Sequence, residues 1–184
     1  MGGPATVGGK EVPSTDNFLP KTFRFPCVIV KDGSECKEEV EWKSVEHLFQ
    51  AMKFDSTKTE TKGHCRNIQE AEDAWNALFL GRSRKHPLRE GWEEVKGHAM
   101  YLAVKAKYDQ NPECSSELVN TTGPILGAPD HWQELNSNVL ERVRFELSSE
   151  SKGEESTEYK NWCQATDLPD GSEPIKVYLS PASA

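Results

Sequence analysis

The stretch WKSVEHLFQAMKF, residues 42–54, decides the fold prediction, because its apolar residues take up the period of a helix. Ser44 is a favourable N-cap residue, so a helix is expected over residues 44–54. Four apolar residues follow at the i, i+3, i+4, i+7 spacing: Val45, Leu48, Phe49 and Met52. They predict one face packed against a core and a polar strip beside it.

The polar strip of this helix brings three different functional groups together. Glu46, Gln50 and Lys53 recur at helical spacing, so a carboxylate, an amide and an ammonium group lie beside the apolar face. Glu46 also falls in the first turn, where the helix dipole stabilises an anion. Spacing alone leaves two interpretations: an acid placed for the dipole with solvated neighbours, or the polar wall of a functional site.

The residues before this helix predict a single hairpin. Residues 23–30 have the pattern of a strand, residues 31–34 that of a turn, and residues 40–42 that of a short return strand. Residues 1–14 are rich in glycine and proline and are expected to be a flexible N-terminus.

A second helix is expected after a polar loop at residues 55–66. It should begin with a capping box at residues 67–70, bury Trp75 and Phe79 in its apolar stripe, and end at Gly81.

Three more helices are expected downstream: at residues 88–109, from Pro112 onward, and from Trp132 to Leu147, after a loop at residues 121–131. Five helical segments against one strand pair predict a mainly α fold, an irregular helical bundle with a small β-hairpin near the N-terminus.

The helical pattern fails after Leu147, where a low-complexity acidic run begins. Residues 148–184 are therefore expected to form an acidic, mobile C-terminal tail, and the domain to span residues 15–147. Tyr159 and Trp162 could still dock a short helix, and residues 174–179 could add a short strand.

Composition and charge exclude several classes of function. The 184 residues suit one domain, and the net charge of −8 disfavours broad, phosphate-driven binding to duplex nucleic acid. Five cysteines without a CxxC spacing, no apolar run of membrane length and no signal-peptide pattern favour a cytoplasmic or nuclear setting without a membrane partner. No zinc-ligand spacing and no glycine-rich nucleotide motif is present, so neither a metal nor a cofactor is expected.

Residues 42–54 closely resemble the central motif of the NADAR (YbiA-like) domain family. Six further pieces follow the family's order: Asp16-Asn17-Phe18, Leu80-Gly81-Arg82, Gly91-Trp92 through Lys96, Ala106-Lys107-Tyr108, Leu118 to Gly123, and Arg142-Val143-Arg144. The resemblance covers residues 15–147 and implies a YbiA-like fold. In one departure, Gly127 stands near the position where many bacterial members carry a second glutamate, which puts a mechanism with two glutamates in doubt.

The resemblance implies hydrolysis of an N-glycosidic bond between C1′ of a ribose and a nitrogen. The leading hypothesis is a hydrolase that removes ADP-ribose from guanine, in DNA repair or from a free nucleoside, with ADP-ribosylated DNA bound only locally. One alternative substrate is a ribosylamino-pyrimidine intermediate of riboflavin synthesis. Another alternative, favoured by the absent glutamate, is a module that binds ADP-ribose or an NAD-related ligand without turnover. A third is an interaction protein that uses its acidic tail.

The resemblance and the chemistry together suggest roles for particular residues. Glu46 would stabilise the oxocarbenium-like state or activate water. Asp130 or a lysine would protonate the leaving nitrogen; Lys53 or Lys107 could instead form a Schiff base at C1′, or simply bind a diphosphate. Nine residues are candidates for substrate contacts: Asn17, Phe18, His47, Gln50, Arg82, Trp92, Lys107, Trp132 and Asn136. For Trp92 a core position is favoured, and His47 could orient Glu46 or only pack.

Overall fold

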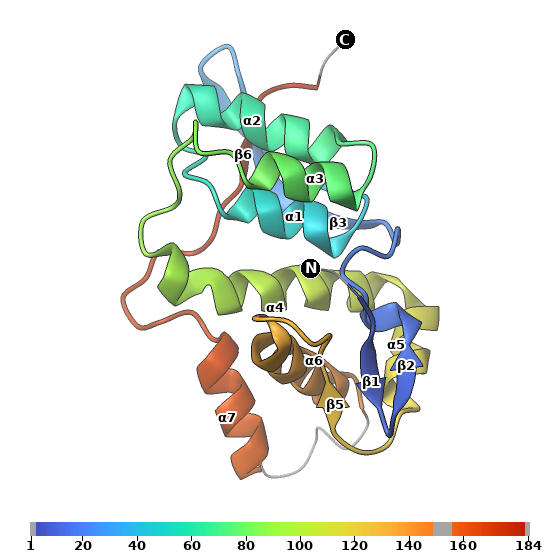
Figure 1. Cartoon of the computed structure of the whole chain (residues 1–184). Coiled ribbons are helices and arrows are strands. Elements are labelled where there is room, and N and C mark those ends of the chain that lie inside the picture. The colour runs from blue at the N-terminus through green and yellow to red at the C-terminus, as the bar shows by residue number, and fades with distance from the viewer. Residues whose placement is uncertain (1–2, 149–155, 183–184) are drawn as a thin grey trace.

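The long helix α4 (Trp92–Gln110) organises the molecule. The computed structural model describes residues 3–148 and 156–182, and Figure 1 shows α4 crossing the middle with other helices on either side. On one side lie α1 (Val45–Met52), α2 (Thr59–Glu70) and α3 (Ala74–Gly81). On the other side lie α5 (Pro112–Val119), α6 (Gln133–Leu147) and α7 (Thr157–Thr166).

Two three-stranded sheets accompany the helices. In the larger one, β3 (Phe23–Lys31) pairs antiparallel with β4 (Ser34–Trp42) and parallel with β6 (Tyr178–Leu179). In the smaller one, β1 (Ala5–Val7) lies between β2 (Lys10–Val12) and β5 (Ile125–Leu126), antiparallel to both. A short 3-10 helix, Pro13–Thr15, connects the small sheet to the loop before β3.

The prediction of a mainly α fold is wrong, because the described residues form two sheets beside seven α-helices and make an α/β protein. The predicted hairpin is confirmed as β3–β4, with Asp32 and Gly33 at φ 51° and 77° in its two-residue turn. The other strands have only two or three residues, too few for alternation to be recognised. Three of them, β1, β5 and β6, also pair with segments far away in the sequence.

Four of the predicted helices are confirmed, α1, α4, α5 and α6, and the cap of α1 is the expected one. The Ser44 hydroxyl oxygen accepts a hydrogen bond from the backbone N–H of His47, which satisfies one free donor of the first turn. Pro112 begins α5, where its missing N–H has no cost. None of the helices in the described part of the chain has the length and apolar character to cross a bilayer.

The predicted loop at residues 55–66 is wrong, because α2 already begins at Thr59. Most of the side chains that α2 buries are polar or weakly apolar, so an apolar period could not reveal it: Thr61, His64, Cys65, Arg66 and Ile68. The predicted capping box at residues 67–70 is instead the last turn of α2. Asp73 caps the following helix by accepting from Asn76 N (2.8 Å).

Trp75 and Phe79 were predicted to face the core, but the structure exposes 60% and 76% of them. Helix α3 instead turns its small residues inward, with Ala77 and Gly81 buried and α1 as its neighbour. A close approach between two helices needs small side chains, and bulky residues are then left on the outer face.

The N-terminal segment, expected to be flexible over residues 1–14, is folded over residues 5–15. Gly8 and Gly9, at φ 58° and 79°, form the turn between β1 and β2. From the sequence alone, these glycines indicated only a flexible segment. The backbone N–H of Ala5 donates to Thr15 Oγ1 (2.6 Å). The side chains of Ala5, Val7 and Val12 are buried, so this segment belongs to the domain.

The C-terminal segment, expected to be a mobile tail over residues 148–184, contains α7 and β6 and adds several side chains to the core. Helix α7 packs against α4 and α6. Farther on, Ile175, Val177 and Leu179 are buried, and Val28 N donates to Val177 O (2.9 Å). Residues 149–155 lie outside the described part of the chain.

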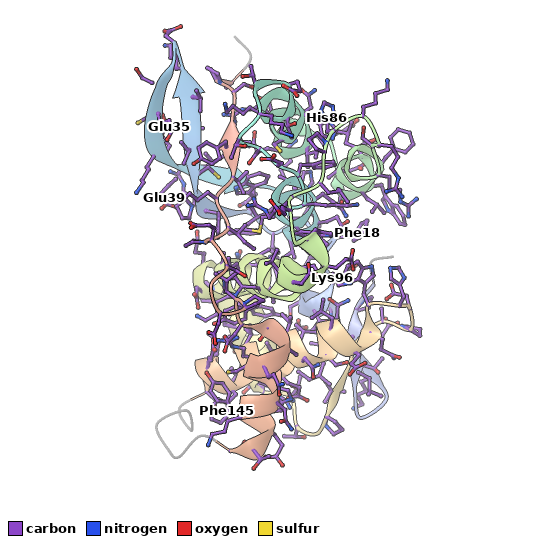
Figure 2. All side chains as sticks on the ribbon, turned by 90° about the vertical axis from the view of Figure 1, so that its left-hand side faces the viewer. Phe18, Glu35, Glu39, His86, Lys96 and Phe145 are labelled. Atoms are coloured by element: carbon purple, nitrogen blue, oxygen red, sulfur yellow. The ribbon has the colours of Figure 1, made fainter. Side chains whose placement is uncertain are left out.

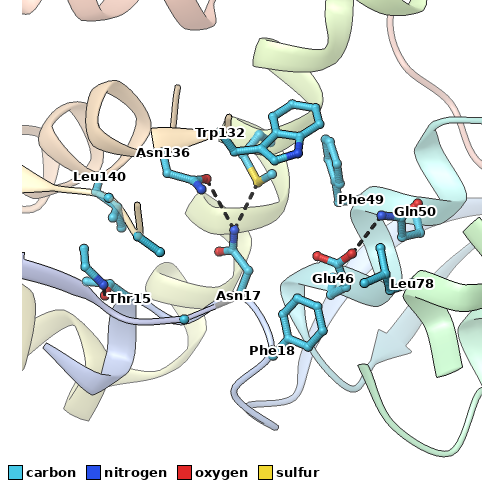
Figure 3. Close-up of a pocket in the computed structure, with 15 residues that line it drawn as sticks. Thr15, Asn17, Phe18, Glu46, Phe49, Gln50, Leu78, Trp132, Asn136 and Leu140 are labelled. Atoms are coloured by element: carbon cyan, nitrogen blue, oxygen red, sulfur yellow. Dashed lines mark hydrogen bonds between the residues drawn. The ribbon is translucent and has the colours of Figure 1, made fainter. Parts of the chain in front are cut away.

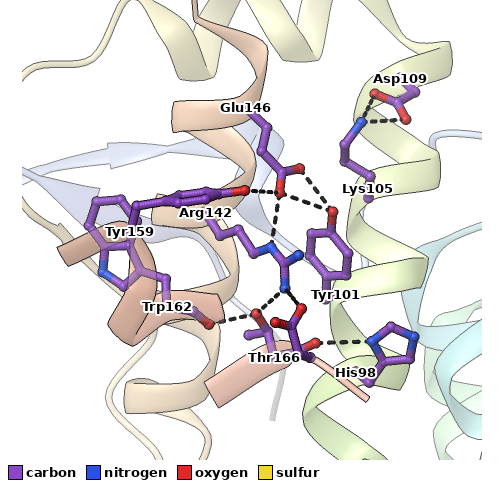
Figure 4. A network of polar contacts seen from close by, with 10 residues as sticks. His98, Tyr101, Lys105, Asp109, Arg142, Glu146, Tyr159, Trp162 and Thr166 are labelled. Carbon is purple, nitrogen blue, oxygen red and sulfur yellow. Dashed lines mark hydrogen bonds and ion pairs between the residues drawn. The ribbon is translucent and has the colours of Figure 1, made fainter. Parts of the chain in front are cut away.

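Arg142 of α6 is the centre of the polar contacts that hold α7 (Figure 4). Its guanidinium group donates to Glu146 Oε1 (2.9 Å), Thr166 Oγ1 (2.7 Å) and Asp167 Oδ1 (2.7 Å). It also lies over the ring of Tyr101 of α4, 3.8 Å from the ring centre. Three helices thus meet at one side chain whose charge is matched by two carboxylates.

Candidate active site

Glu46 is a buried carboxylic acid at the N-terminal end of α1. Its side chain lies inside the molecule, and only 6% of the residue is exposed. Its backbone N–H donates to the carbonyl oxygen of Asn17 (3.0 Å), which joins α1 to the loop before β3. Because its neighbours on the helix face the apolar core, the local sequence forces this acid into the interior.

Glu46 lines a pocket between the two groups of helices (Figure 3). One wall comes from the α1–α3 side and includes Phe18, Phe49, Gln50 and Leu78. The other wall comes from α6 and the loop before it, with Trp132, Asn136, Leu140, Gly127 and Ala128. Met100 of α4 lies between the walls. Figure 2 shows Phe18 and Lys96 near the boundary between the two groups of helices, away from Glu35 and Glu39 on the projecting β3–β4 hairpin.

The Glu46 carboxyl group is tuned by its surroundings. Burial raises its pKa to about 7, while a hydrogen bond from Gln50 and the charge of Lys53 oppose that rise. Gln50 Nε2 donates to Glu46 Oε1 at 2.7 Å. A carboxyl group with this pKa exchanges its proton near neutral pH, which is typical of catalytic acids and bases.

Cationic side chains lie beside this wall of the pocket. Lys53 donates from Nζ to the carbonyl oxygen of Gly81 (2.9 Å). Its pKa is lowered by burial, and further by the charges of Arg84 and Arg82. Lys53 therefore lies in a local cluster of positive charge in a chain that is acidic overall, and such a cluster suits an anionic group.

The opposite wall is polar and aromatic. Asn17 Nδ2 is 3.4 Å from Asn136 Oδ1 and 3.5 Å from the sulfur of Met100, which brings the two predicted asparagines together. The Trp132 ring meets Phe49 edge to face at 5.7 Å, and Lys96 Nζ lies 5.2 Å from the centre of the Trp132 ring. Lys96 was not a predicted site residue, because a lone half-buried lysine on a long helix has no distinguishing sequence signal.

Six of the predicted site residues line this pocket: Asn17, Phe18, Glu46, Gln50, Trp132 and Asn136. Lys53 and Arg82 are not among the residues that line it, and Arg82 is exposed just after the end of α3. Asp130 lies on the loop before α6, where its Oδ1 accepts from Trp132 N (2.7 Å).

Three predicted site residues lie in the packed interior instead. His47 is bonded at both ring nitrogens, to Ser44 Oγ (2.8 Å) and to the carbonyl oxygen of Ala71 (3.3 Å). Trp92 is buried and packs 5.4 Å from the Phe49 ring, which is the core position favoured for it. Lys107 is fully buried and donates to Ser14 O (2.6 Å), and burial lowers its pKa to about 8.

Gly127 lines the pocket, and it stands near the position where many bacterial members of the family carry a second glutamate. A Cβ at residue 127 would lie 2.6 Å from the carbonyl oxygen of Gln133 and 3.1 Å from Asn136 Cβ. The path of the backbone therefore leaves no room for a glutamate side chain here. Within the described residues, no three histidine, cysteine, aspartate or glutamate side chains gather as a metal site would require.

Comparison with known proteins shows the family to which the chain belongs. The family model of the NADAR domain matches residues 13–128. Because this match covers more than half of the chain, the chain belongs to the NADAR domain family. The matched residues contain Asn17, Phe18, Glu46 and Gln50 of the pocket, and they end just before Trp132 and Asn136.

Several curated proteins are similar over part of their length. The N-glycosidase YbiA of Escherichia coli is 36% identical over 80 residues, which cover 44% of this chain and 47% of that protein. The riboflavin biosynthesis protein PYRR of Zea mays is 29% identical over 150 residues, 74% of this chain and 23% of that protein. A riboflavin biosynthesis protein of Vibrio vulnificus is 32% identical over 67% of this chain and 34% of its own length. The matched residues thus span 23% to 47% of the length of these relatives.

A solved structure supports the fold. The NMR structure of the Escherichia coli protein YbiA aligns with a TM-score of 0.54 and 24% sequence identity, over 79% of this chain and 83% of that one. At this identity the likeness concerns the fold.

Proposed function

We propose that this protein is an N-glycosidase that hydrolyses the bond between C1′ of a ribose and a nitrogen, with ADP-ribose attached to guanine as the preferred substrate. The observation that carries the proposal is the buried Glu46 carboxyl group at the pocket wall, with its raised pKa and its hydrogen bond from Gln50. The name of one relative, N-glycosidase YbiA, supports the same class of reaction.

In this mechanism the Glu46 carboxylate faces the sugar as the C1′–N bond breaks. Positive charge develops on C1′ and the ring oxygen, and a fixed carboxylate in a water-poor pocket stabilises it. Water then adds to C1′ and gives up a proton, while the leaving nitrogen gains one. Because Glu46 must be ionised to stabilise the positive charge, turnover should increase as the pH rises through about 7.

The cations beside Lys53 support a substrate that carries phosphate. Arg82 and Arg84 lie close enough to Lys53 for their positive charges to lower its pKa. An anionic diphosphate would relieve this mutual repulsion, and guanidinium groups bind phosphate oxygens in pairs. We therefore place the phosphates of the substrate at this end of the pocket and the base toward the aromatic wall at Trp132.

A ribosylamino-pyrimidine is the second candidate substrate, because two similar proteins carry the name riboflavin biosynthesis protein. It presents the same C1′–N bond on a smaller ligand. The cationic cluster at Lys53 favours the larger, more highly charged substrate, since one monophosphate would occupy less of it.

The test is a comparison of substrates. The full chain is incubated with ADP-ribosylated guanosine and, separately, with a ribosylamino-pyrimidine phosphate, and the products are identified by mass spectrometry. We expect free ADP-ribose and guanosine from the first, at a higher kcat/KM than for the second. Binding of ADP-ribose by isothermal titration without hydrolysis of either compound would contradict the proposal and favour a binding module.

A further inference from the structure

Gly81, the last residue of α3, lies directly against the side chain of Gln50. A Cβ built on Gly81 would fall inside contact distance of Gln50 Oε1, 2.5 Å from its Cδ and 2.9 Å from its Cγ. The backbone of Gly81 is in a conformation open to every residue type, since its φ is not positive. Space for the Gln50 amide is therefore the reason that a side chain is excluded at this position.

The nitrogen and the oxygen of the Gln50 amide are in different surroundings. On one side its Nε2 donates to Glu46 Oε1 at 2.7 Å. On the other side its Oε1 is buried and has no hydrogen-bond partner among the described residues. A buried amide oxygen that forms no hydrogen bond does not hold the side chain in place. The orientation of the amide therefore depends on the bond to Glu46 and on the space beside α3.

Gly81 also contacts the site through its own backbone. Its carbonyl oxygen accepts from Lys53 Nζ (2.9 Å), so one residue of α3 contacts both Gln50 and Lys53, the two polar side chains that follow Glu46 at helical spacing. Helix α3 can approach α1 this closely because the residues that face it are small.

We infer that Gly81 is a positioning residue for Glu46 that acts through Gln50: the bare backbone at residue 81 leaves the space in which the Gln50 amide can donate to the Glu46 carboxylate. The inference rests on the proposed function only for its effect on turnover. The effect on the Glu46 carboxyl group itself can be measured without any substrate.

The test is the substitution Gly81→Ala. The clashing atoms belong to the far end of a flexible side chain, so we expect the fold to survive and the amide to move. Loss of the Gln50 hydrogen bond removes an interaction that favours the ionised carboxyl group. The pKa of Glu46, followed by carbon-13 NMR of its carboxyl group, should therefore rise by about one pH unit.

Two further variants make the result specific. Gln50→Ala should raise the pKa of Glu46 by a similar amount, and adding Gly81→Ala to it should change nothing more, because the two substitutions remove the same bond. Gly63→Ala in α2 is the matched control, since a Cβ there meets nothing within 4 Å, and it should leave that pKa unchanged.

Each outcome bears on the inference. An unchanged Glu46 pKa in Gly81→Ala, or shifts that add in the double variant, would overturn it. If Gly81→Ala folds only when Gln50→Ala is also present, the contact between the two residues is supported. If both the single variant Gly81→Ala and the double variant fail to fold, the contact with Gln50 is not what excludes a side chain at residue 81. A shifted pKa in a protein that hydrolyses nothing would uphold the positioning role while refuting the proposed function.

Discussion

At the scale of single residues, the acid at the pocket wall is expected to destabilise the fold at neutral pH. The pKa of Glu46 is raised from an ordinary value of 4.5 to about 7, so between these pH values the folded protein holds a proton that the unfolded chain has released. The free energy of unfolding must then fall as the pH rises through that interval and level off above it. A site that carries such an acid therefore lowers the stability of the molecule.

The substitution Glu46→Gln tests this expectation by equilibrium unfolding. It should increase the free energy of unfolding at pH 8 by about 3 kcal/mol, because an amide has no charge to desolvate. The increase should shrink as the pH is lowered and vanish below about pH 4.5, where the wild-type acid is protonated in both states. An equal difference between the proteins at pH 4 and pH 8 would contradict the account.

Two lysines that the sequence left equivalent are distinguished by their surroundings. Lys107 is fully buried and bonded to Ser14 O, whereas Lys53 lies next to the Gln50–Glu46 wall. If a Schiff base forms at C1′, borohydride should trap an adduct that Lys53→Ala abolishes. Lys107→Met should leave that adduct in place while lowering the melting temperature. If Lys107→Met abolished the adduct and Lys53→Ala did not, Lys107 and not Lys53 would be the residue that forms the Schiff base.

The local sequence could predict part of this site and not the rest. Glu46 and Gln50 follow from helical spacing and the family motif, because both lie on the one helix with a clear amphipathic period. His47 shares that helix, yet Ser44 and Ala71 occupy both of its ring nitrogens. Which neighbour a residue meets depends on tertiary packing, and this is why Lys96 beside Trp132 and the contact of Gly81 with Gln50 gave no signal.

At the scale of elements, helix α7 depends on the charge network around Arg142. Its guanidinium group bonds Glu146 in α6, Thr166 at the end of α7, and Asp167. The side chain is only 10% exposed and that of Glu146 is 16% exposed. Removal of Arg142 would therefore leave a largely buried carboxylate without its counter-charge.

The prediction is that Arg142→Ala lowers the free energy of unfolding by about 3 kcal/mol, the range found when one partner of a buried ion pair is removed. Lys105→Ala is the matched control, because it removes a more exposed pair with Asp109 on α4; it should change stability by less than about 1 kcal/mol. Denaturant titration gives the free energy of unfolding of both variants. If both lose the same free energy of unfolding, the network around Arg142 contributes no more than a surface ion pair.

The elements that the sequence predicted correctly are those with a strong local signal. The β3–β4 hairpin has a glycine turn directly after the apolar run of β3, and α1, α4, α5 and α6 have caps or apolar periods. Helix α2 was missed because it buries polar side chains, and β1, β5 and β6 because strands of two or three residues depend on distant partners. These omissions produced the wrong fold class.

At the scale of the whole molecule, the C-terminal segment packs against elements formed by the first half of the chain. After α7 it returns to the larger sheet, where β6 pairs with β3 and Leu179 is fully buried. Leu179→Ala in the full chain should therefore lower the free energy of unfolding by about 2–5 kcal/mol. The exposed neighbour Lys176, changed to alanine, should alter it by no more than about 0.5 kcal/mol. Equal stabilities of the two variants would show that this segment is the detachable tail its composition suggested.

The pocket also belongs to the whole molecule, because its walls come from two groups of helices that meet along α4. The central claim is that the Glu46 carboxylate acts on the substrate between these walls. The measurement that tests it most directly is kcat of Glu46→Gln at pH 8 on ADP-ribosylated guanosine, with ADP-ribose binding measured on the same protein. We predict that kcat falls by about 10²–10³-fold while binding is retained. An unchanged kcat together with a lowered melting temperature would show that Glu46 is only a charge at a helix end, and would contradict the account.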